Sequence, residues 1–335
     1  MHLLYVGDVH ATPTELDDCD SLLALVAHTA QTRPVDAVVF SGDVHNTHDI
    51  VNVSVIAFWK RWFAELAAIT GSPPVVVRGN HDQGGPYAAH PNVLLAYPEV
   101  RAPDAGDEAV GPGIVALPYY HDAAAFVAAA VDARRRHPQA HTLLCHQTFQ
   151  GARYENGFYA QGGDVVALED VPFAQVYSGH VHTPQRLGKI VYVGAPRWRT
   201  RADVNVDRHL LLLEVTPDMT VEVAAIPTGA ACRRLWAGVD LPEAPYAAPS
   251  AYDATKDRLW VDVYGPDAEA VRAREAVMKA HYGALTRGFP DRQRRADVSE
   301  AVGIDVSLHR FVDAFTPPHG TPVMTLRTML EGRLG

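Results

Sequence analysis

Short apolar runs of strand length recur along the first part of the chain, and each is followed by glycine or a polar residue. Continuous apolar runs that end in turn-forming residues are typical of buried strands. We therefore predict a buried strand at each of these runs. They are Leu3–Val6, Ala37–Phe40, Val75–Val77, Thr142–Cys145 and Gln175–Tyr177.

Longer segments with helix-like patterns separate these strands, at Asp20–Gln31, Val53–Ile69 and Ala123–His137. Alternation of strands and helices predicts an α/β fold with mostly buried sheets. Two later strands, His209–Val215 and Thr220–Ile226, are close enough in the sequence to form a hairpin.

The pattern changes after residue 227, which divides the chain into three predicted parts. Residues 1–227 form the first domain. Residues 228–256 are rich in proline and alanine, a composition typical of linkers. Beyond them, an alternating strand at Leu259–Tyr264 precedes a helical segment over residues 267–282. We predict a small α+β domain over residues 257–335, acting as a cap or as a partner-docking element.

Composition is that of an ordinary globular protein, with 335 residues, 47% hydrophobic and 20% charged. The formal net charge of −10 argues against a simple basic nucleic-acid binder. The three cysteines form neither a zinc-like spacing nor an even set, which favours a reducing cytoplasm. No apolar run approaches membrane-spanning length, so we expect neither export nor membrane insertion.

Residues of metal-ligand type follow the predicted strands. His180 and His182 share a face of an extended segment, although such a pair alone is more often a surface feature. Because ligands in α/β folds gather outside the carboxyl ends of strands, we expect the five strand ends to converge on one site. The candidates are Asp8, His10, Asp43, Asn80, His81, His146, His180 and His182.

This donor set contains oxygen and nitrogen but no thiolate, so it suits Mn²⁺, Fe or Zn²⁺ rather than a cysteine-rich structural zinc. One ion could not use so many ligands, whereas two neighbouring ions could. Two-metal sites clamp the attacking and leaving oxygens of an in-line displacement at phosphorus. A hydroxide held between the two metals is then the natural nucleophile, since metal binding brings the pKa of water toward neutral.

In order and spacing, these motifs resemble the full set of the calcineurin-like metallophosphoesterases, over roughly residues 1–227. The motifs are Asp8-x-His10, Gly42-Asp43, Gly79-Asn80-His81-Asp82, His146 and Gly179-His180-x-His182. The resemblance implies a four-layer βαβ sandwich, in which two mixed sheets are flanked by helices. Within that superfamily the chain is most similar to Mre11/SbcD-type DNA repair nuclease subunits, especially the short phage forms. The segments that carry this closer similarity are His146-Gln147, Asn156–Tyr159, Gly179–Thr183 and Tyr192–Pro196.

The resemblance implies two divalent cations, with Mn²⁺ favoured and Fe or Zn²⁺ as alternatives, and with Asp43 as the bridge between them. Each ion would be held by three further residues. The first set is Asp8, His10 and His182, and the second is Asn80, His146 and His180.

The resemblance also implies a catalytic role for His81, which would contact the phosphate or the leaving group and would not bind metal. Asp82 would orient His81. Some nuclease relatives place a histidine three residues after the bridging aspartate, where this chain has Asn46. Whether His45 or His48 substitutes for that histidine is left open by the sequence.

The function implied by the resemblance is Mn²⁺-dependent exonuclease and endonuclease action on DNA in repair or recombination. The enzyme would be a homodimer and would pair with a Rad50/SbcC-like ATPase. Arg197, Arg199 and Arg201 could present a basic face to the phosphate backbone, with a solvated loop as an equally good interpretation. Tyr154 could stack on a base or simply pack.

The sequence is compatible with two other functions. The same metal site could belong to a phosphatase or cyclic-nucleotide phosphodiesterase acting on small molecules or phosphoproteins. A metal-stabilised scaffold for a partner ATPase is a non-enzymatic alternative. The presence of Asp8 and His81 argues against the scaffold, because loss of either would have favoured it.

Overall fold

The structure is a computed structural model of the chain. It describes residues 1–48, 50–85, 91–103, 108–204, 206–229, 231–238 and 252–290. Among these residues, no helix has the length and apolar character needed to cross a membrane. The described chain divides into two compact units, Met1–Val261 with Val277–Thr286, and Asp262–Ala276 with Arg287–Pro290.

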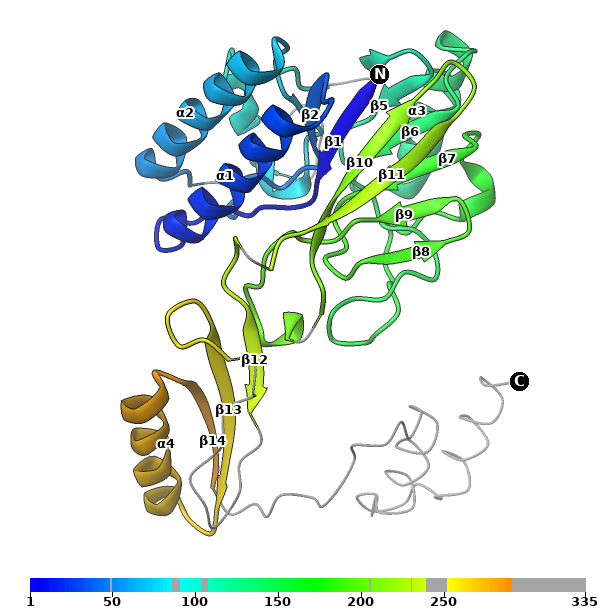
Figure 1. The fold of residues 1–335 in the computed structure, drawn as a ribbon. Coiled ribbons are helices and arrows are strands. Elements are labelled where there is room, and N and C mark those ends of the chain that lie inside the picture. The colour runs from blue at the N-terminus through cyan, green and yellow to red at the C-terminus, as the bar shows by residue number, and fades with distance from the viewer. Residues whose placement is uncertain are drawn as a thin grey trace, which may run out of the picture. The chain divides into compact units, whose positions relative to one another are not determined.

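The first sheet has five strands in the order β11-β10-β1-β2-β3 (Figure 1). The three strands β1, β2 and β3 are parallel, whereas β10 and β11 run antiparallel to their neighbours, so the sheet is mixed. The strand bounds are β1 His2–Val6, β2 Ala37–Phe40, β3 Val75–Val76, β10 His209–Val215 and β11 Thr220–Pro227.

The second sheet has six strands in the order β4-β5-β6-β7-β9-β8. Its four central strands are parallel, and the edge strands β4 and β8 are antiparallel to their neighbours. The bounds are β4 Glu108–Gly111, β5 Ile114–Ala116, β6 Thr142–Cys145, β7 Gln175–Ser178, β8 Gln185–Leu187 and β9 Ile190–Tyr192.

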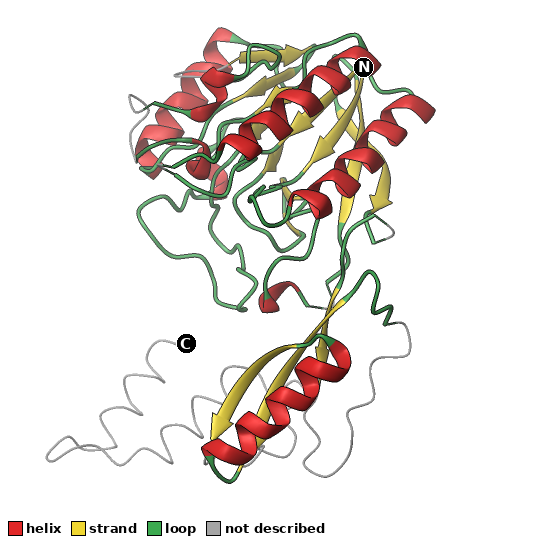
Figure 2. Ribbon diagram, turned by 90° about the vertical axis from the view of Figure 1, so that its left-hand side faces the viewer, coloured by secondary structure: helices red, strands yellow, loops and turns green. Residues whose placement is uncertain are grey.

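Helices cover the outer faces of the two sheets, as Figure 2 shows. The first sheet is covered by α1 (Leu16–Thr32) and α2 (Val53–Thr70), and the second by α3 (Ala123–Arg136). The Asn52 side chain caps α2 by accepting a hydrogen bond from the backbone N–H of Ser54 at 2.9 Å. Asp122 caps α3 in the same way.

The two sheets pack face to face through a core of alternating strand residues. In β1, Leu4 faces the helices while Leu3 and Tyr5 face the other sheet, where they lie in one cluster with Leu144 and Tyr177. The layers therefore run helix, sheet, sheet, helix. The predicted four-layer α/β sandwich is confirmed.

A third sheet follows later in the chain, with the strand order β12-β13-β14. β12 (Leu235–Gly238) pairs in parallel with β13 (Arg258–Gly265), and β14 (Leu285–Pro290) is the other edge. α4 (Ala268–Tyr282) lies between β13 and β14 in the sequence. β12 lies inside the segment predicted as a linker, and residues 291–335 of the predicted C-terminal domain lie outside the described residues.

Short 3-10 helices complete the described elements. The one over Asn80–Asp82 is separated from the end of β3 by three residues and carries three of the candidate site residues. The others are Val93–Ala96, Leu168–Asp170 and Arg201–Asp203.

Candidate metal centre

The candidate ligands follow the carboxyl ends of five parallel strands, β1, β2, β3, β6 and β7. The structure brings them together from both sheets, as the pattern of the sequence predicts. Among the described residues, the non-glycine residues with positive φ are His10 (49°), Asp43 (46°) and His180 (77°). Residues that carry a side chain rarely adopt this backbone conformation. Its use at three candidate ligands indicates that side-chain placement there outweighs backbone preference.

The first cluster joins Asp8, His10 and His182, whose ligand atoms lie within 4.8 Å of one another. The Nε2 atoms of His10 and His182 are 2.9 Å apart. His182 Nε2 is also 3.9 Å from Asp8 Oδ2, and His10 Nε2 is 3.5 Å from Asp43 Oδ2.

The second cluster joins Asp43, His146 and His180, with the same spread of ligand atoms. Asn80 completes it, because its Oδ1 lies 3.1 Å from His146 Nε2 and 2.8 Å from His180 Nδ1. His146 Nε2 lies 3.3 Å from Asp43 Oδ2. The same Asp43 oxygen therefore belongs to both clusters, which is the position of a bridging ligand.

These distances fit a pair of divalent cations. Ligand atoms about 2.1 Å from an ion lie about 3 Å from one another when they meet at a right angle. The nitrogens of His10 and His182 face each other at that separation with at most one proton between them. Four buried residues with 2% exposure or less supply the charge and lone pairs, namely Asp8, His10, Asp43 and His146.

Hydrogen bonds outside the clusters hold the ligands in place. The His146 Nδ1–H donates to the Ser41 carbonyl at 2.9 Å, which turns Nε2 toward the cluster. Ser41 Oγ–H donates to Asp8 Oδ1 at 2.5 Å, and His180 N–H donates to Asp8 Oδ2 at 2.7 Å. The His81 N–H donates to Asp43 Oδ1 at 2.8 Å, so Oδ2 of Asp43 stays turned toward the clusters.

Two glycines allow the backbone to pass close to the side chains of His146 and Asp43. Gly42 has a φ of 117°, and a Cβ there would lie 2.4 Å from His146 Nδ1. A Cβ at Gly79 would lie 2.1 Å from Asp43 Oδ1. Any side chain at either position would displace a candidate ligand, which is why glycine precedes the aspartate and the asparagine.

Electrostatics couple the buried groups strongly in the protein without metal. Burial opposes ionisation of Asp43, but His146 and His10 outweigh it and hold the pKa of Asp43 well below its usual value. Burial lowers the pKa of His146, but Asp43 and Asp8 outweigh it and raise that pKa to about 9. Burial, with the charge of His146, lowers the pKa of His180 to about 4. A cation entering the second cluster therefore displaces a proton from His146.

His81 lies beside the first cluster, with its ring centroid 4.8 Å from that of His10. Its Nδ1–H donates to the Asn46 carbonyl at 2.7 Å, so Nε2 carries the free lone pair. A ligand atom of His81 lies within 4.8 Å of one each from His10 and Asp43. Geometry alone would allow His81 to bind metal.

Asp82 does not orient His81 in the way that the resemblance implies. Its carboxylate accepts backbone N–H bonds from Gly79 at 3.0 Å and from His45 at 3.2 Å. Burial, reinforced by the charge of Asp43, raises the pKa of Asp82 to about 7. Asp82 therefore stabilises the turn that carries His81, while the Asn46 carbonyl orients the ring.

The structure separates the two histidines that flank Asn46. His45 is buried, with Nε2 2.7 Å from the Tyr97 hydroxyl. His48 is exposed and stacks on His81, with ring centroids 4.1 Å apart. His48 is therefore the one that lies beside the candidate catalytic ring.

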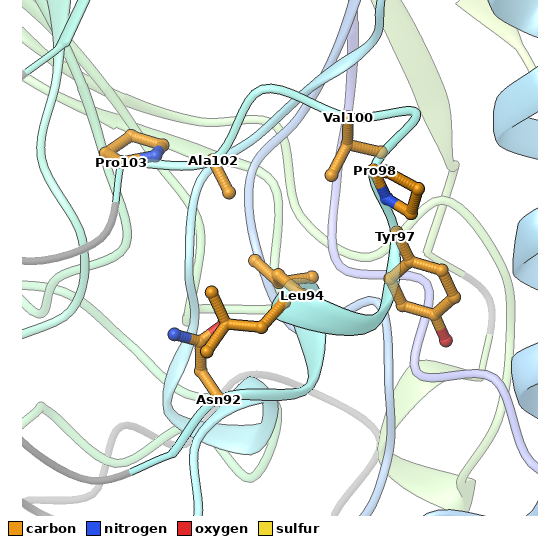
Figure 3. Close-up of a pocket in the computed structure, with 8 residues that line it drawn as sticks. Asn92, Leu94, Tyr97, Pro98, Val100, Ala102 and Pro103 are labelled. Atoms are coloured by element: carbon orange, nitrogen blue, oxygen red, sulfur yellow. The ribbon is translucent and has the colours of Figure 1, made fainter.

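Tyr97 also lines a cavity of about 240 Å³ next to the 3-10 helix Val93–Ala96 (Figure 3). Its walls are mostly apolar, with Leu94, Val100 and Ala102 around it. None of the candidate metal ligands lines this cavity, so the cavity is separate from the metal centre.

The predicted DNA-contacting residues fall into different environments. Arg197 is 1% exposed, and its guanidinium donates to the carbonyls of Val9 and His10, so the prediction that it contacts DNA is wrong. Arg199 is mostly buried and donates to Asn46 Oδ1 at 2.7 Å. Arg201 is exposed and stays a predicted contact. Tyr154 is half-buried against the core of the second sheet, which favours packing.

Glu155 is a site residue that sequence reasoning missed. Its Oε1 lies 2.7 Å from His182 Nδ1. Glu155 lies in the loop between Tyr154 and the segment Asn156–Tyr159, and no spacing rule connects it to His182. Ser41 was missed for a similar reason, although its place before Gly42-Asp43 could have suggested a supporting role.

The four-layer fold and the buried His/Asp clusters together define a metal-dependent phosphoesterase. The chain belongs to the calcineurin-like phosphoesterase family, whose model matches residues 1–184, more than half of the chain. No curated protein matches the sequence significantly.

Proposed function

We propose that the protein is a two-metal phosphodiesterase that cleaves DNA, in the manner of the Mre11/SbcD-type nucleases that its motifs resemble. The observation that carries the proposal is the position of Asp43 Oδ2. This oxygen lies 3.5 Å from His10 Nε2 and 3.3 Å from His146 Nε2, one nitrogen from each cluster. A single carboxylate oxygen shared in this way suits two adjacent ions rather than two separate sites.

The ligand sets follow from the two clusters. Asp8, His10 and His182 hold one cation in this proposal, and Asn80, His146 and His180 hold the other. When bound, two divalent cations supply Lewis acidity at phosphorus and lower the pKa of water enough to make hydroxide available. We propose that both ions are Mn²⁺. Fe and Zn²⁺ are alternatives, because the same oxygen and nitrogen ligands also bind them.

His81 handles a proton in this scheme. With Nδ1–H held by the Asn46 carbonyl, Nε2 is the atom that gains or loses a proton. Burial lowers the pKa of His81, with Asp43 acting against it, so its imidazolium is a stronger acid than a free one. Protonated at Nε2, His81 can donate to the leaving oxygen as the ester bond breaks.

Support for a nucleic-acid substrate comes from the loop that carries Glu155. Phe158 is 66% exposed and Tyr159 is 55% exposed. The guanidinium of Arg153 lies 5.2 Å from the centroid of the Tyr159 ring. Exposed aromatic rings beside an arginine are suited to unpaired bases and backbone phosphates. Glu155, on the same loop as these rings, contacts His182 of the metal centre. The loop therefore places the rings near the proposed site of cleavage.

The partners are proposed by similarity to the same nucleases. We infer a homodimer that works with a Rad50/SbcC-like ATPase in DNA repair or recombination. Residues 257–335 would cap the DNA or dock the ATPase, with residues 228–256 as the connection.

The substrate class can be tested with purified protein and three substrates: linear DNA, a bis-aryl phosphodiester and an aryl phosphomonoester. We expect Mn²⁺-dependent cleavage of both diesters, with the DNA products short and the monoester cleaved slowly. A matched preparation of the variant His81→Ser should bind metal and cleave none of them. Cleavage of the bis-aryl ester with intact DNA would contradict the nuclease proposal and favour a small-molecule phosphodiesterase. Preference for the monoester would favour a phosphatase.

A further inference from the structure

The two ring nitrogens of His182 have different partners. Nε2 faces His10 Nε2 at 2.9 Å and Asp8 Oδ2 at 3.9 Å, inside the first cluster. Nδ1 points the other way and lies 2.7 Å from Glu155 Oε1. A neutral imidazole carries one N–H, and a carboxylate can only accept. The N–H of His182 is therefore on Nδ1, and the lone pair is on Nε2.

We propose that Glu155 is the positioning residue that fixes His182 as a metal ligand, an inference that rests on the two-metal site proposed above. Its carboxylate holds the ring in the tautomer and the rotation that present Nε2 to the cation. A carboxylate bonded to the outer N–H of a ligating histidine also makes the inner nitrogen a stronger donor.

The other histidines of the centre lack an equivalent partner among the described residues. His10 Nδ1 is buried with no hydrogen-bond partner. His146 uses a backbone carbonyl, that of Ser41, which carries no full charge. His180 Nε2 lies 3.9 Å from Asp164 Oδ2, too far for a hydrogen bond. Of these four histidines, His182 is therefore the one whose ring nitrogen facing away from the cluster forms a close hydrogen bond to a carboxylate in the described structure.

The main chain of both residues is held in place as well. The His182 carbonyl accepts hydrogen bonds from the Arg208 guanidinium and from the Ala195 N–H, the latter at 3.1 Å. On the other side, backbone hydrogen bonds at 2.9 Å close the turn that follows Tyr154, from Gly157 to Tyr154 and from Tyr154 to Phe158. Glu155 thus sits in a closed turn opposite a fixed histidine, which makes its carboxylate a preorganised partner.

The contact has a consequence for one metal position only. His182 belongs to the first cluster, and Glu155 touches no residue of the second cluster in any hydrogen bond of the described structure. Loss of the carboxylate should therefore lower the affinity for one cation strongly and the affinity for the other only slightly. A general structural role of the loop would affect both cations or the fold itself.

The test is a titration of metal-free full-length protein with Mn²⁺ alone, followed by calorimetry, for Glu155→Gln and Glu155→Ala. Glu155→Gln keeps a carbonyl oxygen for the Nδ1–H but removes the charge, so one dissociation constant should rise about 10-fold. Glu155→Ala removes the partner, and the rise should approach about 100-fold. The second dissociation constant should change less than about threefold. Glu214→Gln, at an exposed residue of β10, is the matched control and should match wild type.

A double-mutant cycle with His182→Gln separates positioning from folding. Once the ligand is removed, Glu155→Gln should cause no further change in Mn²⁺ affinity. Equal weakening at both metal positions, or an undiminished effect of Glu155→Gln in the His182→Gln background, would overturn the inference. If wild type binds two Mn²⁺ but leaves DNA intact, the proposed nuclease function fails while this inference stands.

Discussion

The Nε2 atoms of His10 and His182 lie 2.9 Å apart, although the two residues are 172 positions apart in the chain. One ring follows β1 of the first sheet and the other follows β7 of the second. The first metal position therefore depends on the packing of the two sheets against each other, and neither sheet could form it alone.

Replacing either ring should remove one cation of the pair. We expect His10→Gln and His182→Gln each to raise the dissociation constant of one of the two Mn²⁺ ions at least about 100-fold, because each deletes a direct nitrogen ligand. The number of tightly bound ions should fall from two to one in equilibrium dialysis. His2→Gln, at the start of β1 and away from the clusters, should keep both. Retention of both ions by His182→Gln would contradict the assignment.

Replacing Asp43 should weaken the binding of both cations. Asp43→Asn preserves the shape of the side chain but removes the charge that the clusters share, so both dissociation constants should rise. Calorimetric titration of Mn²⁺ into Asp43→Asn and wild type measures the change. An unchanged constant for either ion would rule out the bridging role.

His81 separates catalysis from metal binding. His81→Asn should lower the rate of diester cleavage by about 10²- to 10⁴-fold while both Mn²⁺ stay bound, because the ring moves a proton rather than holding metal. The measurement pairs single-turnover kinetics with a metal count on the same sample, and exposed His121→Asn is the control. Loss of one ion together with activity would make His81 a ligand, as its distance from His10 and Asp43 would allow.

Arg197 should contribute to stability rather than to DNA binding. Arg197→Met leaves the carbonyls of Val9 and His10 without their buried donor, so we expect a loss of about 3 kcal/mol in the free energy of unfolding. Urea unfolding of the metal-free protein gives this value, with exposed Arg33→Met as a control within about 0.5 kcal/mol of wild type. A variant of unchanged stability with weakened DNA binding would restore the contact predicted from the sequence.

The metal-free protein should lose stability between pH 7 and 8.5. Folded His146 has a pKa of about 9, against about 6.5 in the unfolded chain. The folded state alone holds this proton in that range, so the contribution of His146 to stability is full below pH 6.5 and falls by about 2 kcal/mol as the pH rises to 8.5. Urea unfolding in chelator should show the fall, and His146→Gln should make it shallower. A flat or rising profile for wild type would contradict it.

The sequence predicted the strands that carry ligands because each is an apolar run that ends in a turn. It missed β4 and β8, where Glu108, Gln185 and Arg186 interrupt the apolar pattern, and it also missed β5. Helix α1 begins at Leu16, four residues before the predicted start, because the first turn is acidic and breaks the apolar pattern.

Within the site, the sequence identified the residues that the structure brings together but not their supporting contacts. Asp8, Asp43 and His146 lie next to glycines or at strand ends, which are local signals. Glu155 reaches His182 only through the fold, so no local pattern could indicate it. Arg197 was misjudged because burial of a guanidinium depends on carbonyls 188 positions away.

The shared position of Asp43 predicts two cations side by side. Crystals soaked in Mn²⁺ and measured for anomalous scattering at the manganese edge would locate both ions. We predict two anomalous peaks, one touching His10 and His182 and the other touching His146 and His180, with Asp43 in contact with both. A single peak, or His180 and His182 on the same ion, would contradict the account.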